Sequence, residues 1–262
     1  MANIFDLTDR VATIVGAGSG IGEAIAIGAA QAGARVVCLD VNGASAEAVA
    51  ARIRADGAEG SHAVLDIRDA AAVDRHFGAI HAEHGRFDIV VCTPSINFRK
   101  KILDYQDEEL DRVLDLNLRG NFNVLRSAGR IMTARRSGSI ILFSSIRAQV
   151  VEPGQSVYAA TKAGILQLAR GAASEFGPYG VRVNAIGPGV IDTPLTAPIR
   201  NNAAWSDAYA AKSVFNRWGR ADEMVGPALF LASDASSFVT GTILYADGGW
   251  LGVDGRFTPP GM

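Results

Sequence analysis

A tyrosine and a lysine four residues apart, Tyr158 and Lys162, are the side chains of this sequence best suited to acid–base chemistry. Residues with this spacing share one face of a helix, so the ammonium can sit beside the phenol. A free tyrosine has a pKa of about 10, and an adjacent cation favours the phenolate, which suits proton transfer at neutral pH. Ser145 follows a predicted strand and can hydrogen-bond a substrate oxygen. A proton donor and a second hydrogen bond on one carbonyl, beside a nicotinamide, meet the needs of hydride transfer.

The segment from Arg10 to Asp40 predicts the element that would hold such a nicotinamide cofactor. It reads as an apolar strand, a glycine-rich turn from Gly16 to Gly22, an alanine-rich helix and a second strand that ends on Asp40. A turn at a helix N-terminus presents unpaired N–H groups to an anion such as pyrophosphate, and glycine lets the backbone approach it. Asp40 can accept both ribose hydroxyls of an adenosine and repel a 2′-phosphate, which favours NAD over NADP.

Composition narrows the class of protein. The chain has 262 residues, 48% apolar and 20% charged, with a net charge of −2. We expect one globular domain, residues 1–262, and no nucleic-acid partner. No apolar run approaches the ~20 residues that cross a bilayer, and the N-terminus lacks a basic segment followed by an apolar one, so we expect a cytoplasmic protein without a membrane partner. Cys38 and Cys92 lie in apolar runs, where reduced thiols are expected, and no metal site is predicted.

Short Val/Ile-rich runs alternate with alanine-rich helices along the chain, which predicts an α/β fold. We expect a doubly wound (Rossmann-type), mostly parallel sheet of seven strands with helices on both faces. After the second strand, helices are predicted at 44–55, 69–85, 107–134, 155–175 and 224–231, and strands at 62–65, 88–92, 139–144, 182–186 and 243–247. Ligands of such a sheet bind beyond the carboxyl ends of its strands.

The regular alternation breaks after residues 187–189, Gly-Pro-Gly. The insertion from Ile191 to Trp218 is too long for a turn, so residues 191–218 are predicted to form a mobile substrate lid. The C-terminal tail, residues 250–262, has no predicted role in the core, and we expect that it can reach a neighbouring subunit's active site.

Taken in order, these motifs resemble the short form of the short-chain dehydrogenase/reductase family over nearly the whole chain. A Tyr-x-x-x-Lys pair is common by chance, whereas the full ordered set is not. The matching residues are Val15 to Gly22, Asp40, Asp66 with Ile67, Asn117, Ser144 with Ser145, Tyr158 with Lys162, Gly187 to Gly189 with Thr193, and Asp247 followed by two glycines.

The resemblance implies a catalytic tetrad. Tyr158 is the expected acid/base, and Lys162 is expected to lower its pKa and to hold the nicotinamide ribose. Ser145, preferred to Ser144 because it lies thirteen residues before Tyr158, would steady the substrate oxygen. Asn117 would hold a water that links the lysine to solvent, although it can instead be a packed amide.

The resemblance also implies the contacts of the cofactor NAD, with adenine near Asp66 and Ile67 and the nicotinamide carboxamide near Ile191 and Thr193. Thr193 can alternatively be only a helix cap. The full predicted set is Gly16, Ser19, Gly20, Ile21, Asp40, Asp66, Ile67, Thr93, Tyr158, Lys162, Ile191 and Thr193.

Two positions depart from the family pattern. Val15 replaces a threonine whose hydroxyl would tie down the glycine turn. The usual Asn-Asn-Ala-Gly after the fourth strand is replaced by Cys-Thr-Pro-Ser at residues 92–95, where Pro94 fixes φ and removes an N–H donor. The second departure puts the affinity for the cofactor in question, even with an intact tetrad.

Polar and aromatic residues near the predicted site indicate the substrate class. The stretch with Asn97, Arg99 and Lys100 loosely resembles gluconate and related sugar-acid dehydrogenases, and several cations can clamp a carboxylate. We therefore expect an NAD-dependent oxidoreductase acting on a secondary alcohol or ketone, with a small polyol, sugar acid or hydroxy acid as substrate. The same cations can instead be solvated surface charges. The other predicted substrate contacts are Arg147, Gln149, Trp205, Tyr209 and Trp218.

Two other functions stay open. One is a regulatory NAD-binding protein that has lost turnover, against which the complete Ser/Tyr/Lys set argues. The other is an epimerase or dehydratase that uses the same tetrad, although such relatives are usually longer at the C-terminus. By family resemblance, we expect the two long helices to pair chains into a homodimer or homotetramer.

Overall fold

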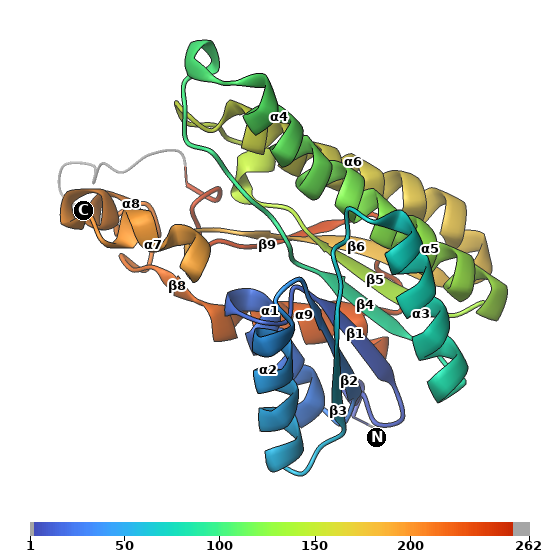
Figure 1. Cartoon of the computed structure of the whole chain (residues 1–262). Coiled ribbons are helices and arrows are strands. Elements are labelled where there is room, and N and C mark those ends of the chain that lie inside the picture. Colours follow the sequence, from blue (N-terminus) through green and yellow to red (C-terminus); the bar gives the residue numbers. More distant parts are fainter. Residues whose placement is uncertain (1–2, 254–262) are drawn as a thin grey trace.

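The structure, a computed structural model, describes residues 3–253 and is built on a parallel sheet of seven strands (Figure 1). The strand order is β3-β2-β1-β4-β5-β6-β9, so the chain reverses its direction of winding between β1 and β4. The predicted doubly wound α/β fold is confirmed. The strands are β1 (Val11–Val15), β2 (Arg35–Asp40), β3 (Gly60–Val64), β4 (Ile89–Cys92), β5 (Gly138–Phe143), β6 (Val181–Pro188) and β9 (Ile243–Ala246).

Helices cover both faces of this sheet and bury two apolar cores (Figure 1). Because side chains alternate along a strand, Val37 and Leu39 of β2 enter one core while Val36 and Cys38 enter the other. The first core lies under α3 (Ala70–His84), α5 (Asn121–Arg135) and α6 (Ser156–Phe176), and the second under α1 (Gly20–Gln31), α2 (Gly43–Ala55) and α9 (Val225–Ala232).

The long helix predicted over residues 107–134 is present, and it contains a π-helical turn. It consists of α4 (Asp107–Leu114), the turn (Asp115–Gly120) and α5, which follow one another without a break. In this turn, the Nδ2 atom of Asn121 donates a hydrogen bond to the carbonyl of Asn117 (2.9 Å), so a side chain binds the carbonyl four residues back. Such turns within helices are frequent at functional sites. The predicted tetrad residue Asn117 lies inside it.

Residues 191–218 form a folded substructure beside the carboxyl edge of the sheet (Figure 1). Ile199, Tyr209 and Trp218 build a small apolar core of their own, and the indole Nε1 of Trp218 donates to the carbonyl of Ser206 (2.9 Å). Movement of this segment stays a prediction. Its elements are β7 (Ile191–Asp192), which pairs with β8 (Gly219–Arg220), and the helices α7 (Ala197–Arg200) and α8 (Ala203–Ala210).

Short 3₁₀ helices connect several of these elements, and they lie at Ile102–Asp104, Ile146–Ala148, Gly177–Tyr179, Pro194–Thr196, Ala221–Met224 and Asp234–Ser236. Both cysteines are free and buried, as predicted, and burial raises the pKa of each thiol to about 12. Within residues 3–253, no helix has both the length and the apolar character that spanning a membrane requires.

A buried carboxylate joins the amino ends of two central strands. Asp88, 5% exposed, accepts hydrogen bonds from the backbone N–H of Val11 (2.9 Å) and from the guanidinium of Arg86 (2.7 and 3.1 Å). We expect Asp88→Ala to lower the free energy of unfolding by about 2–4 kcal/mol, because it leaves a buried donor and a cation unpaired. Urea denaturation measures this loss.

The matched control is Asp74→Ala, which breaks an ion pair with Arg130 whose side chains are 42% and 64% exposed. An exposed pair contributes little, so this variant should lose less than about 1 kcal/mol. Equal losses in the two variants would contradict the role assigned to Asp88.

Candidate active site

A cavity of about 440 Å³ lies where the carboxyl ends of β1, β2 and β4 meet the start of α1. It is the position at which an open parallel sheet binds dinucleotides, between the strands where winding reverses. Most of the predicted cofactor residues line it, namely Gly16, Ser19, Gly20, Ile21, Asp40, Asp66, Ile67, Thr93 and Thr193.

The glycine turn is shaped by close approach of backbone atoms. Gly16 and Gly20 have positive φ values of 82° and 56°, which side-chain-bearing residues rarely adopt. A Cβ atom on Gly22 would overlap the carbonyl oxygen of Gly16. Among the described residues, the Ser19 side chain makes no capping hydrogen bond to α1, so the N-terminal N–H groups of this helix face the cavity uncapped. This cradle fits a pyrophosphate.

Thr93 anchors the glycine turn through its hydroxyl group, which the apolar side chain of Val15 cannot do. Its hydroxyl donates to the carbonyl oxygens of Val15 (3.0 Å) and Gly16 (3.3 Å), so β4 anchors the start of the glycine turn from the neighbouring strand. A Cβ atom on Gly16 would overlap this hydroxyl and contact Pro94. The two departures from the family pattern therefore pack directly against each other.

Asp40, at the end of β2, and Asp66, after β3, both line this cavity. Asp40 accepts hydrogen bonds from the backbone N–H groups of Gly18 (2.9 Å) and Asn42 (2.9 Å). Asp66 forms a two-pronged pair with the guanidinium of Arg68 (2.6 and 3.0 Å), and these hydrogen bonds lower the pKa of the carboxyl group. Ile191 lies elsewhere, because its side chain is buried beneath Gly219 of β8 and does not line this cavity.

Tyr158, Lys162 and Ser145 lie together near the carboxyl end of β5. The Nζ atom of Lys162 lies 5.4 Å from the centre of the Tyr158 ring and donates a hydrogen bond to the carbonyl of Phe143 (2.9 Å). Ser144 donates to the carbonyl of Lys162 (2.8 Å), so its hydroxyl serves the helix. Ser145 and Tyr158 both line a second cavity, which agrees with the choice of Ser145.

Burial governs the ionisation of this pair. Desolvation raises the pKa of Tyr158 above its usual value, although the hydroxyl of Ser145 and the charge of Arg147 oppose it. Desolvation also lowers the pKa of Lys162 to about 8. In the protein alone, the cost of burying a phenolate outweighs the nearby positive charges, so the net pKa of Tyr158 is raised. The lowering of this pKa by Lys162 stays a prediction.

Asn117 is fully buried, and its side-chain hydrogen bonds fix the loop after β4. Its side chain accepts a hydrogen bond from the N–H of Ile96 (2.9 Å) and donates one to the carbonyl of Ile96 (2.9 Å) and one to the hydroxyl of Thr161 (3.2 Å). These bonds match the alternative of a packed amide. They link the loop that borders the cofactor cavity to the helix that carries Tyr158 and Lys162.

The second cavity, of about 320 Å³, is lined by Tyr158 and Ser145 and by five residues of the segment 191–218. Four of the predicted substrate residues line it: Asn97, Arg99, Arg147 and Tyr209. The other four do not. Lys100 pairs with Glu109 (2.6 Å), and the Trp205 ring lies 5.0 Å from the guanidinium of Arg99. Trp218 is buried in the core of residues 191–218, and Gln149 follows the 3₁₀ turn without lining the cavity.

Sequence reasoning missed the acid that organises this cavity, Glu152. Its carboxylate binds Arg147 (2.6 Å), Arg99 (2.7 Å), the side-chain amide of Gln155 and the hydroxyl of Tyr209. Burial acts to raise the pKa of Glu152, but these hydrogen bonds and charges outweigh it and lower the pKa. Its position between Ser145 and Tyr158 was the available signal, since that connection must border the site.

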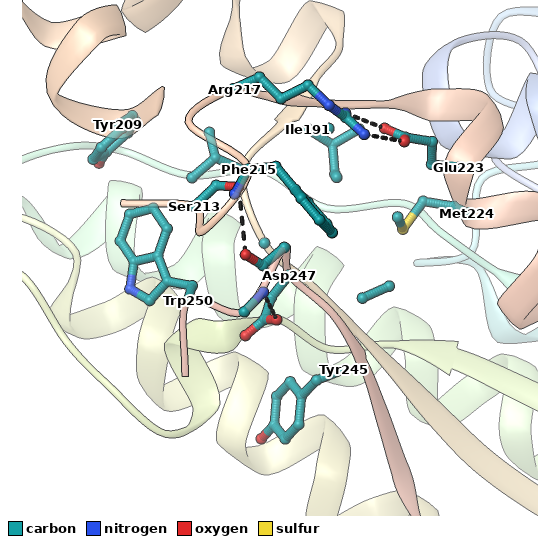
Figure 2. A pocket seen from close by; sticks show the side chains of 16 residues that line it. Ile191, Tyr209, Ser213, Phe215, Arg217, Glu223, Met224, Tyr245, Asp247 and Trp250 are labelled. Atoms are coloured by element: carbon teal, nitrogen blue, oxygen red, sulfur yellow. Dashed lines mark hydrogen bonds and ion pairs between the residues drawn. The ribbon is translucent and has the colours of Figure 1, made fainter. Parts of the chain in front are cut away.

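A third cavity, of about 310 Å³, is drawn in Figure 2 and shares Gly189, Val190 and Tyr209 with the lining of the second cavity. Figure 2 shows Tyr209 and Trp250 on the same side of it, and their ring centres are 5.8 Å apart. The Trp250 ring also lies 5.4 Å from the guanidinium of Arg147. The start of the tail therefore supports the lid and the substrate cavity, while residues 254–262 and their predicted reach to another subunit lie outside the described residues.

Comparison with known proteins agrees with this geometry. A family model described as enoyl-(acyl carrier protein) reductase matches residues 16–251. The 2-dehydro-3-deoxy-D-gluconate 5-dehydrogenase of Pseudoalteromonas atlantica is 36% identical, over 96% of this chain and 100% of its own. Gluconate 5-dehydrogenase of Gluconobacter oxydans is 32% identical, over 94% and 96%.

A solved structure points the same way. A gluconate 5-dehydrogenase from Burkholderia cenocepacia, crystallised in complex with NADP and tartrate, superposes with a TM-score of 0.92 at 36% identity, over 95% of this chain and 98% of its own. The chain belongs to the short-chain dehydrogenase/reductase family. It is an oxidoreductase that uses a nicotinamide cofactor and resembles the gluconate dehydrogenases.

The buried ammonium of Lys162 predicts a pH-dependent stability. Its pKa is about 8 in the folded chain and about 10.4 when unfolded, so the unfolded chain binds the proton more tightly between these values. Stability should therefore rise as pH rises from 8 to 10.4, by about 3 kcal/mol in total. Lys162→Met has no ammonium to titrate at this position. The free energy of unfolding of the wild type should therefore rise relative to that of the variant over this pH range. The free energies of unfolding of both proteins are measured by urea denaturation at each pH. If they change in parallel, the lowered pKa assigned to Lys162 is wrong.

Proposed function

We propose that this protein is an NAD-dependent dehydrogenase that interconverts a secondary alcohol and a ketone on a small sugar acid or related hydroxy acid. The observation that carries the proposal is that Ser145 and Tyr158 border the same cavity as Arg99 and Arg147. A hydroxyl and a phenol can address the reacting oxygen, while guanidinium groups suit a carboxylate a few atoms away. No nucleic acid or membrane enters this function.

Each tetrad residue has a role that follows from its surroundings. The raised pKa of Tyr158 keeps the phenol protonated at neutral pH, so it can donate its proton to a ketone oxygen that Ser145 also hydrogen-bonds. Lys162 provides the positive charge that favours the phenolate left behind. Asn117 holds the loop and the helix in register. When bound, the nicotinamide cofactor supplies or accepts the hydride.

The relatives support the substrate class. Their names include gluconate 5-dehydrogenase and 2-dehydro-3-deoxy-D-gluconate 5-dehydrogenase, and one of the related crystals holds tartrate. All three molecules are small acids that carry both hydroxyl and carboxylate groups. Residues 191–218 serve as the lid, because Leu195, Thr196, Pro198, Ile199 and Tyr209 line the substrate cavity.

Asp40 supports NAD as the cofactor, although related structures contain NADP. Its carboxylate lies at the end of β2 and lines the cavity beside Val41, a residue that offers no charge to a 2′-phosphate. A phosphate placed against this carboxylate would be repelled, whereas ribose hydroxyls can donate to it. Ser19, Gly20, Ile21 and Thr193 would hold the phosphates and the nicotinamide half.

An activity panel tests the proposal. Gluconate, other sugar acids, neutral polyols and apolar secondary alcohols are each incubated with NAD or NADP, and reduced cofactor is followed by absorbance. We expect the sugar acids with NAD to give the highest kcat/KM, and Tyr158→Phe to lower it at least 100-fold. Turnover confined to apolar alcohols would contradict the substrate class.

Asp40→Ser provides the control for the cofactor. If the carboxylate selects NAD, the ratio of kcat/KM for NAD to that for NADP should fall by at least about tenfold in this variant, since one lost charge–phosphate repulsion is worth about 1.4 kcal/mol or more. An unchanged ratio would show that another residue sets the preference.

The chain is further proposed to act in the cytoplasm as a homotetramer or homodimer. Two buried reduced cysteines fit a reducing compartment. Exposed apolar side chains support assembly, among them Leu114 and Phe122 on the long helices and Phe238 after α9. Analytical ultracentrifugation should give a mass two or four times that of one chain, and a monomer at micromolar concentration would refute the assembly.

A further inference from the structure

Glu152 joins three parts of the chain that meet at the substrate cavity. Arg99 comes from the loop after β4, Arg147 from the turn after β5, and Tyr209 from α8 in the lid, and all three bind this one carboxylate. The loop that carries Glu152 is fixed to the first of these segments by a hydrogen bond from the N–H of Lys100 to the carbonyl of Gly154 (3.1 Å). The carboxylate is therefore built into the wall of the cavity and does not line it.

The charges around the cavity do not balance. Among the described residues that line it, only Arg99 and Arg147 are charged, and Glu152 behind them is the single acid that both contact. The other nearby cations do not line the cavity: Lys100 pairs with Glu109, Arg200 pairs with Asp192, Lys212 lies over the Trp250 ring, and the buried ammonium of Lys162 donates to the carbonyl of Phe143. The two guanidinium groups that line the cavity and the one carboxylate they share leave one positive charge.

Both arginines keep donors for a ligand. A guanidinium carries five N–H groups, and Glu152 engages NH1 of Arg99 and NH2 of Arg147. Their planes are held by aromatic rings, since Arg99 lies over Trp205 (5.0 Å) and Arg147 over Trp250 (5.4 Å). A ligand with one carboxylate would neutralise the cavity, whereas a second carboxylate would bring an excess negative charge close to Glu152.

We propose that Glu152 is a positioning residue that sets the net charge of the substrate cavity and so selects substrates with one carboxylate over those with two. It acts through Arg99 and Arg147 and needs no contact with the substrate. The inference deepens the proposed sugar-acid function and depends on it for the identity of the substrate class.

The test compares two six-carbon acids that differ in one terminal group, D-gluconate with one carboxylate and D-glucarate with two. Their dissociation constants are measured by titration calorimetry on the full chain in the presence of NADH, where neither acid can be oxidised. We expect the wild type to bind gluconate more tightly. In Glu152→Gln, the preference for gluconate should fall by about tenfold, because the amide keeps the size of the side chain and removes its negative charge.

Two further variants separate charge from structure. Glu152→Asp keeps the charge on a shorter side chain, so both acids should bind more weakly with the wild-type preference retained. Glu47→Gln removes the same charge from a glutamate held between Arg54 (2.8 Å) and His62 (2.7 Å), outside the cavity, and should leave the preference unchanged. A preference that stays the same in Glu152→Gln, or falls equally in Glu47→Gln, overturns the inference.

The proposed function fails separately from this inference. If the wild type binds gluconate but forms no NADH from gluconate and NAD, the dehydrogenase proposal fails, while the change in preference in Glu152→Gln still decides the role of Glu152. If the wild type oxidises gluconate and the preference does not respond to Glu152, only the inference fails. If neither acid binds to any of these proteins, both are wrong.

Discussion

The site depends on a buried ammonium group held beneath the carboxyl edge of a parallel sheet. Lys162 is 2% exposed, and its hydrogen bond to the carbonyl of Phe143 uses a backbone acceptor at the end of β5. Burying this cation costs free energy, which its lowered pKa reflects. The charge lies where it can stabilise a phenolate at Tyr158. Hydrogen bonds from Ser144 and Asn117 hold the helix that carries both residues in place.

Around this centre, three kinds of contact separate the tasks of the site. Backbone packing shapes the cofactor cradle, because the glycines of the turn approach each other and Thr93 too closely for side chains. Desolvation sets the proton affinity of Tyr158 and Lys162. Ion pairing shapes the substrate cavity, where one carboxylate fixes two guanidinium groups and a lid tyrosine. Each contact type acts on different residues, so the substrate cavity can vary while the cradle stays intact.

Much of this could be predicted from local patterns. The strand, glycine turn and helix between Arg10 and Asp40 appear as predicted. They depend on local backbone geometry within one short segment, which the local sequence pattern reflects. Tyr158 and Lys162 share a helix face, which spacing alone defines. The long helix predicted at roughly 107–134 appears as α4, the π-helical turn and α5 in unbroken succession. Only the π-helical geometry of Asp115–Gly120 was not predicted, because helical periodicity does not encode it.

By itself, the sequence determined the fold class, the dinucleotide cradle and the residues able to transfer a proton, since these follow from periodicity, glycine positions and residue type. Only the tertiary structure decided which charged residues border the substrate. Arg99, Tyr209 and the pair Arg147 and Glu152 come from three separate segments. Lys100 and Trp218, equally plausible in sequence, do not line the cavity. The physical reason is that ion pairs and desolvation depend on distances across the fold. Spacing along the chain does not specify those distances.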